Sequence, residues 1–172
     1  MTQFLLDADV FISAKRLHYG FDFCPGYWNA IIKAFELSRL ASIKPVRDEL
    51  VDAKDDLTKW VKETAPNSLF KKVEDIAVVT GYAGVCQWAS DSEKFSPQAK
   101  SKFLSGADPW LVAYANANDY VIATYEVSEP VSKSSIKLPD AAIQFGVECC
   151  QPREMIRSLD IKLRLSKNSF KN

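Results

Sequence analysis

Acidic side chains stand at points of the chain where folding could bring them together. The stretch FLLDADVFISA (residues 4–14) ends an apolar run with Asp7 and Asp9 and then becomes apolar again. A second apolar run, YVIA, ends at Thr124, and Glu126 follows two residues later. Two further acids stand at the edges of apolar, helix-like segments, VRDELVD and GADPWLVAYA, and these are Glu49 and Asp108.

Carboxylates that converge in a fold need a counter-charge. Two of them ~4 Å apart repel by about 4 kcal/mol at an effective dielectric constant near 20, so either some are protonated or a cation lies between them. Oxygen ligands suit Mg²⁺ or Mn²⁺. A cation held in this way activates water and stabilises an in-line phosphoryl displacement. If the fold gathers the acids, they indicate metal-dependent phosphodiester chemistry.

Helical and strand patterns alternate along the chain, which predicts an α/β fold: a three-layer α/β/α domain with a short, mostly parallel central sheet. Pro25, Pro97 and Pro109 suit the first turns of helices. Asp9 is expected to cap a helix that begins at Val10. Ligand sites in open parallel sheets lie beyond the carboxyl ends of the strands, which is where the acids fall. Apolar runs predict strands at residues 3–7, 42–45, 120–124 and 147–150.

The composition indicates one soluble globular domain, residues 1–160. The 172 residues carry a formal net charge of zero, so the whole molecule offers no bulk attraction to nucleic acid. No signal peptide is visible and no apolar run approaches the ~20 residues of a membrane span, so a cytoplasmic location without membrane contact is expected. The four cysteines form no CxxC pair, which favours reduced, buried thiols. A basic tail, residues 161–172, carries Lys162, Arg164, Lys167 and Lys171.

The order of the acidic motifs resembles that of PIN-domain nucleases. LLDADVFI is similar to their opening LLDTNVLI-type motif, and Glu49 in VRDELVD is similar to their second acid. Asp108 opens an Ala-rich helix, as their third acid does, and Thr124-Tyr125-Glu126 resembles their T-x-D/E motif. More narrowly, YGFDFCPGYW and IKLPDAA resemble a bacterial PIN-like family described as a domain of unknown function. Its relatives include ribonuclease toxins of toxin–antitoxin pairs.

The resemblance implies a function and roles for the site residues. It implies a metal-dependent endoribonuclease, the toxin of a bacterial type II toxin–antitoxin system, with RNA as substrate, a cognate antitoxin as partner and a homodimer as one candidate assembly. The Thr124 hydroxyl would orient the site. Asp9 stands where Asn or Ser is commoner and would either cap its helix or join the metal ligands. Glu126 replaces the usual Asp and reaches further. The acids expected to hold one or two Mg²⁺ or Mn²⁺ ions are Asp7, Glu49, Asp108 and Glu126.

Other interpretations stay open at this point. A PIN-like fold without hydrolysis could act as an RNA- or protein-binding module. Residues 54–105, longer than in compact PIN toxins, could form a helical lid or partner surface. A haloacid-dehalogenase-type phosphotransferase also opens with DxD, but Val10 and Phe11 and the lack of a clear later Lys and Asp-pair motif disfavour it. Some residues have two interpretations: Asp48 and Asp52 as substitutes for Glu49, Trp110 as site lining or core, and His18 as exposed or structural.

Overall fold

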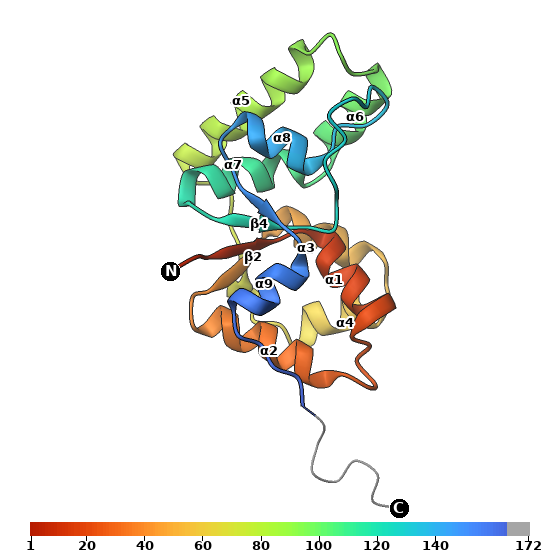
Figure 1. Ribbon diagram of the computed structural model, residues 1–172, viewed down its shortest axis with the longest axis vertical. Coiled ribbons are helices and arrows are strands. Elements are labelled where there is room, and N and C mark those ends of the chain that lie inside the picture. Colours follow the sequence, from red (N-terminus) through yellow and green to blue (C-terminus); the bar gives the residue numbers. More distant parts are fainter. Residues whose placement is uncertain (165–172) are drawn as a thin grey trace, which may run out of the picture.

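A five-stranded parallel sheet forms the centre of the molecule (Figure 1). The structure is a computed structural model that describes residues 1–164. The sheet order is β3-β2-β1-β4-β5, and each neighbouring pair is parallel. The α/β class and the parallel sheet predicted from the sequence are confirmed. The strands are β1 (Phe4–Leu6), β2 (Leu40–Ile43), β3 (Phe70–Lys71), β4 (Val121–Ala123) and β5 (Cys149–Cys150).

Helices cover both faces of the sheet and complete three layers. In Figure 1, α5, α7 and α8 lie above the sheet, and α1, α2, α4 and α9 lie below it. Residues of β1 and β4 such as Leu5, Leu6 and Ile122 are fully buried between these layers. The α-helices are α1 (Ala8–Ser13), α2 (Pro25–Glu36), α3 (Lys44–Asp52), α4 (Asp56–Glu63), α5 (Ile76–Asp91), α6 (Pro97–Ser105), α7 (Asp108–Asn118), α8 (Leu138–Gln144) and α9 (Pro152–Ser158).

The first helix starts earlier than expected. Asp7 has an extended backbone and its side chain accepts a hydrogen bond from the Ala8 backbone N–H (2.6 Å), so Asp7 is the N-cap of α1. Asp9 lies in the first helical turn, and the prediction that Asp9 caps a helix starting at Val10 is wrong. Asp7 is the N-cap because it directly follows β1 and has the extended backbone that an N-cap requires. After α1 the chain widens into a π-helical turn, Ala14–His18.

The second strand ends two residues earlier than expected. It was predicted at 42–45, but Lys44 and Pro45 begin α3, because proline fits the first helical turn and lacks the N–H that a strand ladder needs. Edge strand β3 was not predicted, since two residues give no periodicity. The region 54–105 contains α4, α5 and α6 together with β3 and the 3₁₀ turn Asn67–Leu69, and α5 packs against α7.

The C-terminal end of the fold is described only in part. Lys162 and Arg164 are exposed, whereas Lys167 and Lys171 of the predicted basic tail lie outside the described residues. None of the helices within residues 1–164 has the length and apolarity needed to cross a membrane.

Candidate metal centre

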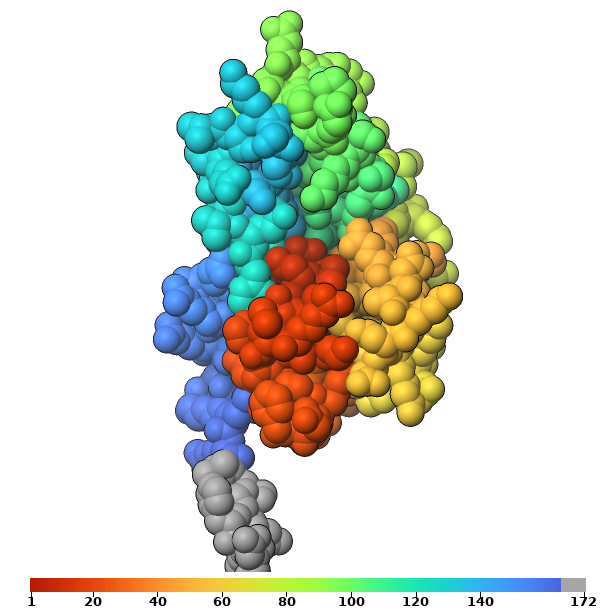
Figure 2. All heavy atoms as spheres, turned by 90° about the vertical axis from the view of Figure 1, so that its right-hand side faces the viewer, coloured from red at the N-terminus to blue at the C-terminus, as the bar shows by residue number. Residues whose placement is uncertain are grey.

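Strands β1 and β4 lie side by side where the direction of the sheet order changes. The chain runs from β1 outward through β2 to β3, then returns to place β4 and β5 on the other side of β1. Such a switch point opens a crevice at the carboxyl ends of the two strands. Asp7 directly follows β1 and Thr124 directly follows β4, so both residues stand at this crevice. Figure 2 views this face and shows the red N-terminal residues meeting orange, green and teal segments at its centre.

One threonine hydroxyl connects two of the carboxylates. Thr124 Oγ1 lies 2.9 Å from Asp7 Oδ2 and 2.9 Å from Asp9 Oδ2. Thr124 and Asp7 are both buried, with residue exposures of 1% and 7%. A hydroxyl has a single proton to donate, so it cannot satisfy both carboxylates at once. A proton on one carboxyl group or a bound cation would offset the remaining negative charge.

One carboxylate oxygen of Asp9 lacks a hydrogen-bond partner among residues 1–164. Its Oδ2 atom lies 2.9 Å from Thr124 Oγ1 and accepts a hydrogen bond from the Tyr125 backbone N–H (2.8 Å). Its Oδ1 atom is buried and has no hydrogen-bond partner within the described part of the chain. Burial raises the pKa of Asp9 from its usual value, against the lowering effect of the bond from Thr124. A buried oxygen without a partner is costly, and a metal ligand or a proton would remove that cost.

Asp108 adds a third carboxylate from a different layer. It is the first residue of α7 and is partly buried. Burial, followed by the negative charges of Glu126, Glu49 and Asp9, raises the pKa of Asp108 to about 7. The Lys102 ammonium lowers it, but by less. Burial and the charges of Asp9 and Asp108 likewise raise the pKa of Asp7 well above its usual value. These mutual effects mean that the acids lie within electrostatic reach of one another.

Glu49 reaches the loop in front of α7. Its Oε1 atom accepts a hydrogen bond from the Ala107 backbone N–H (2.8 Å), and a Cβ on Gly106 would come within 3.6 Å of the same oxygen. Partial burial of its carboxyl group raises the pKa of Glu49, against the lowering effect of that hydrogen bond. Glu49 therefore both fixes the start of α7 and contributes negative charge to Asp108.

Glu126 connects the site to α8. Its Oε2 atom accepts from the Leu138 backbone N–H (2.8 Å), and its own backbone N–H donates to Thr124 Oγ1 (3.1 Å). The charge of Glu126 raises the pKa of both Asp9 and Asp108. A cavity of about 190 Å³ opens on this side of the centre, and Thr124, Glu126 and Gln151 are among its lining residues.

The donor atoms fit a hard divalent cation. Among residues 1–164, no three His, Cys, Asp or Glu side chains already form a group close enough to hold a metal ion. Mg²⁺ does not require such a cage, because one or two carboxylates with waters and a substrate phosphate complete its shell. The partnerless Asp9 Oδ1, the oxygen-only donors and the mutual repulsion of the acids all favour a cation. Asp7, Asp9 and Asp108 would hold it, with Glu49 and Glu126 at the margin.

Two of the remaining candidates have roles outside the site. Asp48, one alternative to Glu49, pairs with Lys44 (2.8 Å) on the exposed side of α3. Trp110 stacks on Tyr82 with ring centroids 3.6 Å apart, so it joins α7 to α5. No motif in the sequence indicates Lys102, which lies in α6 and lowers the pKa of Asp108.

Family membership follows from a comparison with protein-family models. The model described as a domain of unknown function, DUF4411, matches residues 4–163. The chain belongs to this family. The DUF4411 match includes every acid of the candidate centre as well as the π-helical turn. A search of curated proteins found no match to the chain.

Proposed function

We propose that this DUF4411 chain is a divalent-metal-dependent endoribonuclease. The observation that carries the proposal is the buried Asp7–Thr124–Asp9 arrangement, in which two carboxylates share one hydroxyl and Asp9 Oδ1 has no partner among the described residues. Asp108 adds further carboxylate oxygens to this cluster, and oxygen donors favour Mg²⁺ or Mn²⁺. The bound ion would supply Lewis acidity toward a phosphodiester and a water of lowered pKa. The motif resemblance to PIN-domain nucleases supports RNA as the substrate.

The protein's own residues have distinct tasks in this proposal. Asp7, directly after β1, and Asp108, the first residue of α7, would provide carboxylate oxygens for the cation. Thr124 keeps Asp7 and Asp9 in fixed orientations. Glu49 holds the backbone in front of Asp108 through Ala107 N–H. Because the pKa of Asp108 is raised to about 7, this group releases its proton near neutral pH. A bound cation would favour the ionised form and would lower the pH at which the proton leaves.

The biological setting is a further part of the proposal. The similarity of the motifs to toxin ribonucleases supports a toxin of a type II toxin–antitoxin pair, a cytoplasmic location and a cognate antitoxin as protein partner. The region 54–105, which includes the long helix α5, offers exposed apolar side chains such as Ile76 and Val79. This surface is a candidate contact for the antitoxin or for a second copy of the chain.

A non-catalytic RNA- or protein-binding module is the second candidate. One observation favours it: the described residues contain no group of three metal-ligating side chains close enough to hold an ion as they stand. The two functions predict different effects of a divalent cation. A binding module would bind RNA equally well with and without the cation and would leave the RNA intact.

Cleavage of total RNA by the purified protein tests the proposal. Wild type is incubated with Mg²⁺, with Mn²⁺ and with chelator, alongside Asp7→Asn. The control is Asp119→Asn, which changes an exposed acid at the far end of α7. We expect cleavage by wild type and Asp119→Asn only with a divalent cation, and none by a folded Asp7→Asn protein. RNA left intact by wild type under all these conditions would reject the ribonuclease and favour the binding module.

A further inference from the structure

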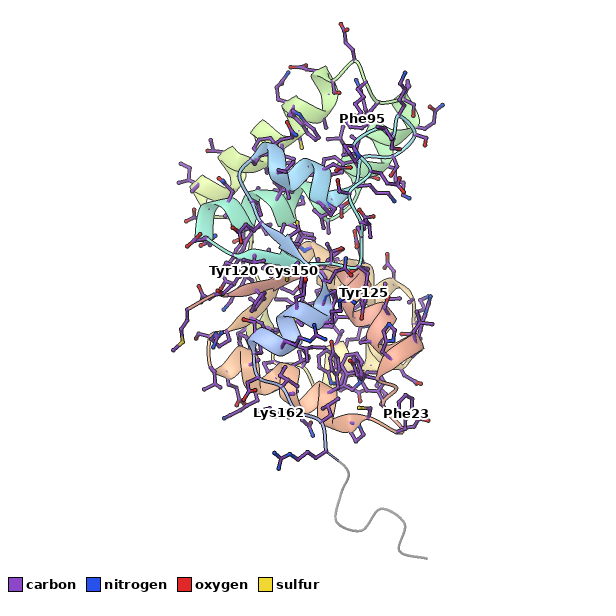
Figure 3. The ribbon with its side chains drawn as sticks, in the orientation of Figure 1. Phe23, Phe95, Tyr120, Tyr125, Cys150 and Lys162 are labelled. Atoms are coloured by element: carbon purple, nitrogen blue, oxygen red, sulfur yellow. The ribbon has the colours of Figure 1, made fainter. Side chains whose placement is uncertain are left out.

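Two aromatic rings lie next to the candidate metal centre. The ring centroids of His18 and Tyr125 are 5.6 Å apart, with planes inclined at 31°. Tyr125 lies between Thr124 and Glu126 in the chain, and its backbone N–H donates to Asp9 Oδ2 (2.8 Å). Its side chain therefore starts beside the acids. Figure 3 shows Tyr125 at the end of β4, beside α1. His18 is exposed and Tyr125 is partly exposed, which leaves aromatic surface accessible to a ligand.

The segment that carries the histidine is held in place. Tyr19, the next residue, stacks on buried Tyr27 at 4.2 Å, and its carbonyl oxygen accepts from the Trp28 indole N–H (2.7 Å). Lys15, in the same π-helical turn, pairs with Asp55 (2.9 Å). Widened π turns are frequent at functional sites, and this one places the exposed His18 imidazole beside the Tyr125 ring.

The charge distribution favours binding of RNA through its bases rather than through its phosphates at this site. An acidic centre repels a phosphodiester backbone, and the chain has no net positive charge to compensate. Stacking of a base on an aromatic face needs no charge and contributes substantially to single-strand binding. Arg16, in the same turn, is exposed and forms no ion pair within residues 1–164, so it is available to a neighbouring phosphate.

We infer that His18 and Tyr125 form a stacking subsite for one unpaired nucleobase of an RNA substrate, adjacent to the metal centre. The inference rests on the proposed ribonuclease function and adds where the substrate is held. A base inside a duplex has both faces covered by its neighbours, so this subsite selects single-stranded RNA. The two rings thereby fix which nucleotide lies beside the acids.

Binding of base-bearing and abasic RNA tests the subsite. Asp7→Asn protein, which does not cleave in the proposed mechanism, is titrated with Mn²⁺ present into two fluorescein-labelled single strands. The strands have equal numbers of phosphates, but one lacks bases at its central positions. Fluorescence anisotropy should give about tenfold tighter binding of the base-bearing strand, at the lower end of what stacking supplies. An RNA duplex of the same sequence should compete poorly.

Substitutions assign that preference to the two rings. His18→Ala and Tyr125→Leu, added singly and together to the same background, should abolish the preference without changing the affinity for the abasic strand. Tyr125→Phe keeps the ring and should keep the preference. Phe23→Ala is the matched control, because Phe23 is also an exposed aromatic residue and lies well away from Tyr125 (Figure 3). Thermal melts establish that each variant is folded. If the double variant is not folded, the single variant His18→Ala is used for the test, because His18 is exposed.

The outcomes separate the subsite from the function. Equal affinity for base-bearing and abasic strands, or a preference that survives the ring substitutions, overturns the subsite. If wild type still cuts RNA in that case, the ribonuclease proposal stands. If no variant binds RNA and wild type cuts none, both proposals fail together.

Discussion

The hydroxyl oxygen of Thr124 lies 2.9 Å from Asp7 Oδ2, although the two residues are 117 positions apart in the chain. The contact joins the carboxyl ends of β1 and β4 across the switch point of the sheet. Asp9 competes for the same hydroxyl at the same distance. Two carboxylates that lie at one hydrogen-bond donor favour an added positive charge, from a proton or from a cation.

The first prediction concerns the shared hydroxyl. Thr124→Val preserves shape but removes the one side-chain donor within residues 1–164 that reaches both carboxylates. Because the Thr124 bond lowers the pKa of Asp7 against the larger effect of burial, its loss should raise that pKa further. It should also destabilise the fold by about 1–3 kcal/mol. Thr124→Ser keeps the hydroxyl and is the control. Urea denaturation and RNA cleavage are measured for both, and a valine variant as active and stable as the serine variant contradicts the assigned role.

The second prediction is a pH dependence of stability without metal. The folded-state pKa of Asp108 is raised from 3.8 to about 7, so its contribution to stability is complete below about 4 and is lost as the pH rises through 7. Asp7 shifts in the same direction. In chelator, the melting temperature of wild type should therefore fall between pH 5 and pH 7.5. The fall should be smaller in Asp108→Asn; identical pH profiles for the two proteins would remove Asp108 from the cluster.

The third prediction separates two tasks of Glu49. Glu49→Gln keeps an oxygen for the Ala107 N–H but removes the charge, whereas Glu49→Ala removes both. Both variants should weaken Mn²⁺ binding by about tenfold, and only the alanine variant should also lose about 1–2 kcal/mol of stability. The control is Asp48→Ala, on the exposed side of α3, where the pair with Lys44 contributes little. Calorimetric titration with Mn²⁺ checks this, and an unchanged affinity in Glu49→Gln would leave Glu49 as a positioning residue only.

Sequence patterns were sufficient for the elements with strong local signals. Asp108-Pro109 predicted the start of α7, and the apolar run through Ile122 predicted β4. The two-residue strand at Phe70 gave no signal, because its place in the sheet depends on pairing with β2 rather than on periodicity.

The candidate site was harder to predict in its details. The motif order named the acids, but it did not reveal that Asp7 caps α1 or that a buried oxygen of Asp9 has no hydrogen-bond partner in the described part of the chain. Such facts depend on where Thr124 arrives from the other end of the chain. The pairing of His18 with Tyr125 was also invisible, since residues more than a hundred positions apart meet only through the sheet topology.

The gathering of acids around a cation is the central claim, and Asp108→Asn is the most informative substitution. The structure places the N-cap of α7 at Ala107, so the variant removes charge without removing a cap. In chelator it relieves repulsion from Glu126, Glu49 and Asp9. The opposing loss of a favourable charge in the first helical turn is about 0.3–1 kcal/mol. Asp119→Asn, at the other end of the same helix, is the control, because asparagine tolerates its left-handed backbone (φ 58°).

Thermal melts of wild type, Asp108→Asn and Asp119→Asn in chelator and in Mn²⁺ test the claim most directly. In chelator, Asp108→Asn should melt at or above the wild-type temperature. Mn²⁺ at a hundredfold excess over Kd should stabilise wild type and Asp119→Asn by about 2.7 kcal/mol and Asp108→Asn by much less, which reverses the order. Equal shifts with Mn²⁺ in all three proteins, or no shift in wild type, would contradict a metal centre that includes Asp108.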